Sequence, residues 1–288
     1  MEYYSFNRYL RNRFGCKVYK ISINGGFTCP NRDGTCGTRG CIFCSAGGSG
    51  DFAEDPRLSV TQQIEKGKLR VQNKIKSGKY IAYFQAFTNT YAPVEVLRKK
   101  FTEAIEHPDI VMLSVATRPD CLPDDVIDLL AQLNTIKPVS VELGLQTIHQ
   151  KSADYIRRGY NLACFDDAVC RLKEAGLEVV CHIILGLPGE SKSDMLQSVD
   201  YACKSGINGI KLQLLHVLKH TDLEKEYRAG KFKTLTFEEY LDIIKSCVKI
   251  IPKEIVIHRL TGDGAKKDLI APLWSADKKK VLNAISKL

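Results

Sequence analysis

Three cysteines in one loop, Cys29, Cys41 and Cys44, are the residues of this chain whose types and spacing most clearly indicate chemistry. Eleven residues separate Cys29 from Cys41, and two separate Cys41 from Cys44. Three thiolates from one loop can hold three irons of a cubane cluster, whereas clusters held by cysteine normally take four. The missing ligand would leave one iron open, much as catalytic zinc keeps an open position. The spacing therefore points to a cluster that binds a substrate or a cofactor.

A fourth cysteine, Cys36, lies inside the same loop and allows a different interpretation. With Cys36 included, the loop offers the four thiolates that a tetrahedral structural zinc site requires. Four unrelated buried thiols fit this stretch less well, because glycine, proline and charged residues fill it and offer no apolar core. The loop by itself leaves both iron and zinc open.

Strand-like and helix-like segments alternate along the rest of the chain. The expected strands cover residues 18–23, 80–84, 110–115, 139–143, 177–185, 210–215 and 255–258. The expected helices cover residues 61–77 and 93–107, begin again at Pro123, and then cover 150–176, 193–205 and 237–250. This alternation predicts an α/β fold with parallel strands. Six such units would form a partial (βα)6 TIM-like barrel, with the chemistry at the C-terminal ends of its strands.

Length and composition are consistent with a single catalytic domain. The chain has 288 residues, 44% of them hydrophobic, and barrels of this length often fold as one unit. We expect one domain over residues 1–288, with a core at about 18–260, an N-terminal extension at 1–17 and a C-terminal extension at 261–288. No run of 18 apolar residues and no signal-peptide pattern is present, so we expect a cytoplasmic protein with no membrane contact. The odd total of 11 cysteines argues against a complete disulfide framework.

A formal net charge of +9 suggests a polyanionic partner. Basic clusters lie at Lys66–Lys79, Arg98–Lys100, Lys266–Lys267 and Lys278–Lys280. Exposed lysines also confer solubility, so charge alone leaves nucleic-acid binding open.

With these motifs laid out in order, the chain resembles the radical S-adenosylmethionine (SAM) superfamily, and within it the elongator catalytic-subunit-like branch. The resemblance covers about residues 18–260 and rests on the cysteine loop and on four later strand ends. It implies that Cys29, Cys41 and Cys44 bind a [4Fe-4S] cluster, with Cys36 outside its ligand shell. It also implies reductive cleavage of SAM to a 5′-deoxyadenosyl radical, with flavodoxin or ferredoxin as an example of the electron donor.

The same resemblance implies the residues that contact SAM. Phe43 matches the aromatic residue that precedes the last cysteine, and Thr88 lies where relatives approach the cofactor's amino group. Gln146 matches a residue that faces the ribose, and Arg158 one that meets the carboxylate, for which a guanidinium is suited. Gly186 closes the fifth strand, where a glycine lets the backbone approach a ligand. The segment Ala116–Asp120 resembles a Glu-Thr-Arg-Pro-Asp motif of that branch, with alanine in place of the glutamate.

Four segments are similar to one bacterial family of small radical enzymes associated with tRNA wobble-uridine maturation. These segments are Ser5–Leu10, Cys29–Thr35, Gln85–Thr90 and Lys211–His216. The resemblance implies conversion of a 5-carboxymethylaminomethyl group to 5-aminomethyl, with tRNA as the partner. The alternatives are a radical SAM enzyme acting on a small molecule such as a porphyrin precursor, and a zinc-stabilised nucleic-acid-binding module.

The sixth expected strand carries candidate substrate residues. Side chains alternate along a strand, so Lys211 and Gln213 should share one face while His216 takes the other. If the pair points into the barrel, Lys211 could meet the carboxylate of the modified uridine; if it points outward, Lys211 lies against solvent or a helix.

Overall fold

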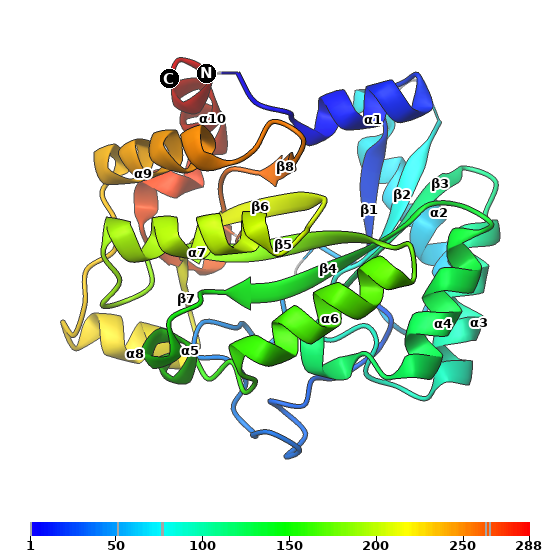
Figure 1. The fold of residues 1–288 in the computed structure, drawn as a ribbon, viewed down its shortest axis with the longest axis horizontal. Helices are drawn as coiled ribbons and strands as arrows, with labels where there is room; N and C mark the ends of the chain where they lie inside the picture. Colours follow the sequence, from blue (N-terminus) through cyan, green and yellow to red (C-terminus); the bar gives the residue numbers. More distant parts are fainter. Residues whose placement is uncertain (1, 51, 76–77, 263, 265) are drawn as a thin grey trace.

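The computed structural model describes residues 2–50, 52–75, 78–262, 264 and 266–288. Its centre is a seven-stranded sheet in the order β1-β2-β3-β4-β5-β6-β8, with every neighbouring pair parallel (Figure 1). The strands of this sheet are β1 (Tyr19–Ile23), β2 (Tyr80–Phe84), β3 (Ile110–Thr117), β4 (Val139–Gln146), β5 (Glu178–Leu185), β6 (Gly209–Leu214) and β8 (Val256–Arg259). The α/β partial barrel predicted from the sequence is confirmed, and β8 corresponds to the seventh expected strand, at residues 255–258, which follows the six βα units.

Helices connect the successive strands and cover the outer face of the sheet (Figure 1). They are α1 (Phe6–Phe14), α2 (Val60–Val71), α3 (Val94–Glu106), α4 (Asp124–Asn134), α5 (Gln150–Tyr155), α6 (Leu162–Glu174), α7 (Lys192–Lys204), α8 (Asp222–Arg228), α9 (Phe237–Ile250) and α10 (Lys278–Ser286). The end of the helix expected at residues 61–77, namely residues 76 and 77, lies outside the described residues. None of the helices in the described ranges combines the length and the apolar character that crossing a bilayer demands.

Alternation along each strand separates an apolar outer face from a polar interior. On β3, Leu113 and Val115 belong to the main core against the helices, while Ser114 between them hydrogen-bonds inside the barrel. On β4, Leu143 packs outward and Glu142 points inward. Because the side-chain period of a strand is two, the register that buries the apolar face necessarily turns these polar residues toward the barrel axis.

The N-terminal helix α1 closes the barrel at the end opposite the expected chemistry. Leu10 on α1 packs in a small core with Val18, Ile81 and Met112, which lie near the N-terminal ends of the first three strands. Ser5 forms an isolated parallel bridge with Ile257, so the chain before α1 also lines the edge of β8. Closure of this end leaves the opposite end of the barrel as the entrance.

The C-terminal part of the chain contributes to the sheet and to the rim of the entrance. Both β6 and β8 hydrogen-bond within the main sheet. After β6, the short strand β7 (Val217–Leu218) pairs antiparallel with β9 (Leu269–Ala271) in a separate two-stranded sheet. β9 therefore brings part of the C-terminal segment against the open end of the barrel.

Candidate active site

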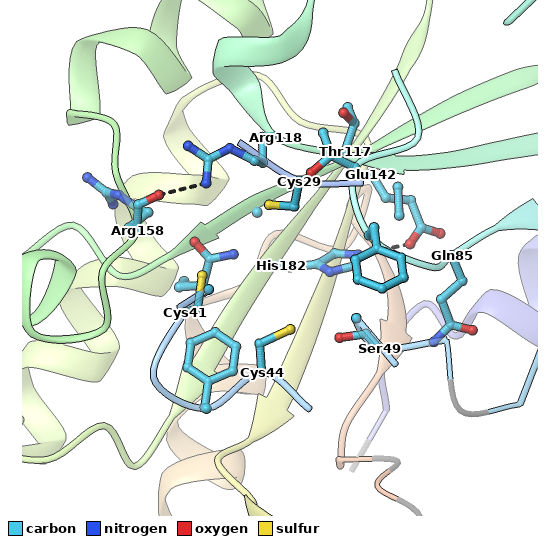
Figure 2. Close-up of a pocket in the computed structure, with 18 of the residues that line it drawn as sticks. Cys29, Cys41, Cys44, Ser49, Gln85, Thr117, Arg118, Glu142, Arg158 and His182 are labelled. Atoms are coloured by element: carbon cyan, nitrogen blue, oxygen red, sulfur yellow. Dashed lines mark hydrogen bonds and ion pairs between the residues drawn. The ribbon is translucent and has the colours of Figure 1, made fainter. Parts of the chain in front are cut away.

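A cavity of about 1000 Å³ opens at the C-terminal ends of the strands. This is the end at which enzymes of barrel architecture hold their active sites. Its walls come from the cysteine loop after β1 and from the ends of β2, β3 and β4, and β5, β6 and β8 complete its floor. Figure 2 shows the three predicted cysteines around one end of this cavity.

Cys29, Cys41 and Cys44 line the cavity, and Cys36 does not. Backbone hydrogen bonds fold the loop so that these three cysteines face the cavity. The Gly40 amide donates to the Asn31 carbonyl at 2.7 Å, and the Cys44 amide donates to the Cys41 carbonyl at 3.0 Å. Cys36 lies on the exposed side of the same loop. The arrangement brings three thiols together and leaves the fourth outside.

The spacing of the sulfur atoms bears on whether the loop forms a closed site for a single ion. A tetrahedral zinc site has Zn–S bonds of about 2.3 Å, which would bring its sulfurs to within about 4 Å of one another. Among the described residues, which include all four loop cysteines, no three cysteine sulfurs lie within 4.8 Å of each other. In the described structure the four loop cysteines therefore do not form a closed tetrahedral set. Three thiols spread around one cavity fit the corners of a cubane.

The thiol of Cys41 lies in an enclosed part of the cavity wall. Burial raises its pKa to about 12, and the neighbouring Cys44 and Cys29 add to the rise. The opposing contribution comes from the Asn31 side chain, whose Nδ2 donates to Cys41 Sγ at 3.4 Å. Cluster ligands bind as thiolates, so an N–H donor at this sulfur stabilises the form that binds iron.

Arg118, which directly follows β3, lies beside the cysteine end of the cavity (Figure 2). Its Nε and Nη2 donate to Asp120 at 2.8 and 2.6 Å, and its Nη1 donates to the Arg158 carbonyl at 3.0 Å. Its guanidinium also lies 4.9 Å from the centre of the Tyr160 ring. Asp120 and Tyr160 hold this cation in place beside Cys29 and Cys41.

Arg158 lines the cavity but is anchored in the protein. It is 2% exposed, and its guanidinium donates to the carbonyls of Leu145, Thr147 and Tyr160 at 3.1, 2.6 and 3.0 Å. Within the described structure its Nη2 has no hydrogen-bond partner. In Figure 2 the guanidinium points away from the cysteines. Arg158 thus fixes the loop after β4 and retains one unused donor.

Gln146 ends β4 in a left-handed backbone conformation, with φ at 62°. Left-handed backbone costs free energy at a residue with a side chain, and such residues gather at functional sites. The side-chain amide nitrogen of Gln146 donates to the Tyr160 hydroxyl at 3.1 Å and to the Leu145 carbonyl at 3.0 Å, and Gln146 lines the cavity. The strand end is therefore held with this amide at the cavity wall.

The remaining predicted cofactor residues fall into two groups. Phe43 and Thr88 line the cavity, Phe43 next to the cysteines and Thr88 as a 1% exposed side chain. Gly186 lies at the end of β5, and the residues that line the cavity do not include it. A Cβ at Gly186 would lie 2.9 Å from a Leu235 methyl group, so this glycine makes room for packing.

Below the cysteines, a charged network spans the barrel from strand to strand. Glu142 is 1% exposed; its Oε1 accepts from Lys20 at 2.5 Å and from Ser114 at 2.9 Å. Its Oε2 accepts from Lys211 and lies 2.9 Å from His182 Nε2. Burial alone would raise the pKa of Glu142, but Lys20, Lys211 and His182 hold it well below its usual range.

Lys211 and Gln213 both point into the barrel. This is the inward one of the two orientations considered from the sequence. Lys211 is 3% exposed, and its Nζ contacts Glu142 and donates to the Tyr83 hydroxyl at 3.1 Å. Gln213 donates through Nε2 to His182 Nδ1 at 3.2 Å. The ammonium of Lys211 is thus already ion-paired inside the barrel.

Several residues in or next to the cavity were not predicted as site residues from the sequence: Asn31, Lys20, Arg118, Glu142, His182 and Arg259. A usable signal existed for some of them. Glu142 and His182 are polar residues in otherwise apolar strands, at positions where a buried side chain needs a partner. Arg118 lies in a motif whose resemblance was recognised. Arg259 carried no local signal, because only the pairing of β8 with β6 brings it to the cavity.

Matches to protein families agree with this geometry. The model of the radical SAM superfamily matches residues 32–202, and that of the radical SAM C-terminal domain matches residues 207–288. The chain therefore belongs to the radical SAM superfamily. It is an enzyme of that superfamily, and its cofactors are a [4Fe-4S] cluster and SAM.

The individual proteins that this chain resembles include proteins of the elongator type. The protein YtqA of Bacillus subtilis (strain 168) is 48% identical over 285 residues, covering 99% of this chain and 88% of YtqA. A tRNA uridine(34) acetyltransferase of Methanocaldococcus jannaschii is 29% identical over 168 residues, covering 57% of this chain and 30% of that protein. The solved structure of Elp3 from Methanocaldococcus infernus has a TM-score of 0.66 and 18% identity, and covers 94% of this chain. The chain spans 63% of that Elp3 chain, so the match shows a shared fold.

Proposed function

We propose that this enzyme modifies the C5 side chain of the wobble uridine in tRNA and converts a 5-carboxymethylaminomethyl group to 5-aminomethyl. The observation that carries the proposal is the cysteine-lined cavity in a chain whose relatives include a tRNA uridine(34) acetyltransferase. When bound, the cluster and SAM supply hydrogen-atom abstraction by a carbon-centred radical. The protein's task is to hold both cofactors and the uridine side chain in one cavity.

The cavity walls divide between the two cofactors. Cys29, Cys41 and Cys44 would hold the cluster, and Phe43 next to them would exclude water from it. Thr88 and Gln146 offer a hydroxyl and an amide to the polar groups of SAM. Arg118, beside the cysteines, and the unused Nη2 of Arg158 are the cationic donors for its carboxylate.

The rim of the cavity supports a large polyanionic substrate. Lys219, Lys266 and Lys267 are exposed and come from the two segments that flank the second strand pair, β7 and β9. Lys219 Nζ donates to the Lys267 carbonyl at 2.8 Å, which holds these segments side by side. Phosphate contacts supply most of the affinity of proteins for nucleic acids, so basic residues at the entrance suit tRNA better than a small neutral molecule.

Mass spectrometry of wobble nucleosides tests this function in cells. tRNA from cells that lack the gene should accumulate the carboxymethylaminomethyl form, and the parental gene should restore the aminomethyl product. The Cys41→Ala gene should fail to restore it, whereas the matched Cys36→Ala gene should succeed. Identical nucleoside profiles with and without the gene would refute the proposed substrate.

A further inference from the structure

Tyr160 lines the cavity, and none of the contacts proposed for SAM uses it. It lies between α5 and α6, in the part of the chain that follows β4. Its hydroxyl makes hydrogen bonds at the end of β4, and its ring lies beside two guanidinium groups. The neighbours on both sides include side chains proposed to bind SAM. Tyr160 therefore connects residues that would contact different parts of that molecule.

The hydroxyl of Tyr160 acts as both a donor and an acceptor. It donates to the Gly144 carbonyl, and it accepts from the side-chain nitrogen of Gln146 at 3.1 Å. Burial raises the pKa of Tyr160, against the opposing effects of Arg158 and Arg118, so the hydroxyl keeps the proton that it donates. Because the nitrogen of the Gln146 amide bonds on this side, the amide presents its oxygen on the other side, as an acceptor for a ligand's hydroxyl.

Gly144 makes room for this arrangement. A Cβ at Gly144 would lie 2.2 Å from an end atom of the Gln146 amide and 3.4 Å from the Tyr160 hydroxyl oxygen. Gln146 itself has a left-handed backbone, with φ at 62°. Such strain persists only where the surrounding groups fix it, and the Tyr160 hydroxyl is one of the groups that hold this side chain. Removal of the hydroxyl should therefore loosen the amide of Gln146.

The ring of Tyr160 lies beside two cations. The guanidinium carbons of Arg118 and Arg158 are each 4.9 Å from the centre of the ring. The two cations oppose each other: burial lowers the pKa of Arg158, and Arg118 lowers it further. The electron-rich face of an aromatic ring attracts cations and offsets part of that repulsion. The ring thus helps to keep both guanidinium groups at the same part of the cavity wall.

We propose that Tyr160 is a positioning residue for SAM: its hydroxyl orients the amide of Gln146 for the ribose, and its ring holds Arg118 and Arg158 for the carboxylate. The inference rests on the SAM contacts of the proposed function and does not depend on the tRNA substrate. Substitution separates the two parts of the side chain. Tyr160→Phe removes the hydroxyl and keeps the ring, whereas Tyr160→Leu removes both.

Competition with radiolabelled SAM tests both parts without turnover, on the cluster-loaded enzyme without reductant. One competing probe is 5′-deoxyadenosine, which has the ribose but no carboxylate, and the other is methionine, which has the carboxylate but no ribose. Tyr160→Phe should weaken binding of 5′-deoxyadenosine about twofold to tenfold, the size of one hydrogen bond, and leave methionine binding unchanged. Tyr160→Leu should weaken both probes, methionine by about fivefold or more.

Tyr201→Phe is the matched control, because the Tyr201 hydroxyl donates to Asp166 between α7 and α6, away from the cavity. It should bind both probes as the parent does. All variants should keep about four irons per chain. Loss of iron by both Tyr160 variants would mean that Tyr160 supports the cluster loop, and it would overturn the inference.

The pattern across the two probes decides between positioning and a general structural role. Equal weakening of both probes by Tyr160→Phe, or of neither, overturns the role of the hydroxyl. Unchanged methionine binding by Tyr160→Leu overturns the role of the ring. If Gln146→Ala also leaves 5′-deoxyadenosine binding unchanged, the proposed SAM contact of Gln146 fails together with the inference. A parent enzyme that binds both probes and converts no carboxymethylaminomethyl tRNA loses the proposed substrate alone.

Discussion

The side-chain amide of Asn31 donates a hydrogen bond to the sulfur of Cys41, with 3.4 Å between Nδ2 and Sγ. Asn31 is 4% exposed, and the same Nδ2 also donates to the Arg157 carbonyl at 2.7 Å. Gly159 makes this packing possible: it adopts φ of 82°, and a Cβ there would lie 2.8 Å from Asn31 Oδ1. The fold thus holds one polar hydrogen against a thiol that we propose as a cluster ligand.

This contact predicts an effect on the reduction potential of the cluster. An N–H donor stabilises the greater negative charge of the reduced state, so Asn31→Ala should lower the potential. A net hydrogen-bond contribution of 0.5–1.5 kcal/mol corresponds to about 20–65 mV for one electron. Redox titration followed by electron paramagnetic resonance measures the shift at equal iron content. An unchanged potential would mean that the Asn31 contact is only structural.

Substitution of single cysteines by alanine tests which thiols bind the cluster. Cys36→Ala should keep about four irons per chain, because Cys36 lies on the exposed side of its loop. Cys41→Ala should lose the cluster, since this thiol lies inside the cavity. Iron and sulfide analysis of anaerobically purified protein gives both values. Iron lost from the Cys36 variant and kept by the Cys41 variant would reverse the assignment.

The fold and the gathering of Cys29, Cys41 and Cys44 at one cavity were predictable because they depend on local patterns. Alternating strand and helix segments fix a parallel sheet, and three cysteines in one loop need little tertiary information to be recognised. The charged interior was not predictable in the same way. Lys20, Glu142 and Lys211 come from β1, β4 and β6, so their contact exists only after the sheet has curled. The burial of Arg158 was not predictable for the same reason. Its guanidinium meets three backbone carbonyls only after the loop that follows β4 has folded.

Glu142 should be essential for stability. Glu142→Gln removes the carboxylate that neutralises Lys20 and Lys211, and breaking a buried ion pair costs about 3–5 kcal/mol. Urea unfolding under anaerobic conditions measures the change. Glu95→Gln is the matched control, because Glu95 forms an exposed pair with Arg98, and such pairs contribute about 0–1 kcal/mol. Equal midpoints for the two variants would contradict the proposed importance of the network.

The buried histidine of the network predicts a loss of stability on mild acidification. Burial lowers the pKa of His182 to about 4, and Lys211 adds to this effect against the opposing pull of Glu142. Between pH 6.5 and 4 the unfolded chain therefore binds more protons at this residue than the folded chain, so stability falls as the pH falls. Glu142 contributes only at lower pH: its pKa lies well below the ordinary value of 4.5, so its stabilisation is complete above pH 4.5 and is lost below.

Urea unfolding at pH 7.5, 6.5 and 5.5 tests this dependence while absorbance confirms that the cluster is retained. The parent should lose stability toward pH 5.5, and His182→Gln should lose less. His220→Gln, at an exposed histidine, is the control and should keep the parental slope. A His182 variant with the parental slope would show that another group causes the acid sensitivity.

The central claim is that this radical SAM enzyme acts on the wobble uridine of tRNA, and one reaction in vitro tests it directly. Cluster-loaded enzyme is incubated anaerobically with SAM, a reductant and tRNA that carries 5-carboxymethylaminomethyluridine, and the nucleosides are analysed by mass spectrometry. We predict 5-aminomethyluridine together with 5′-deoxyadenosine, and neither product from the Cys41→Ala enzyme. Cleavage of SAM by the parent enzyme with the tRNA nucleoside left unchanged would contradict the account.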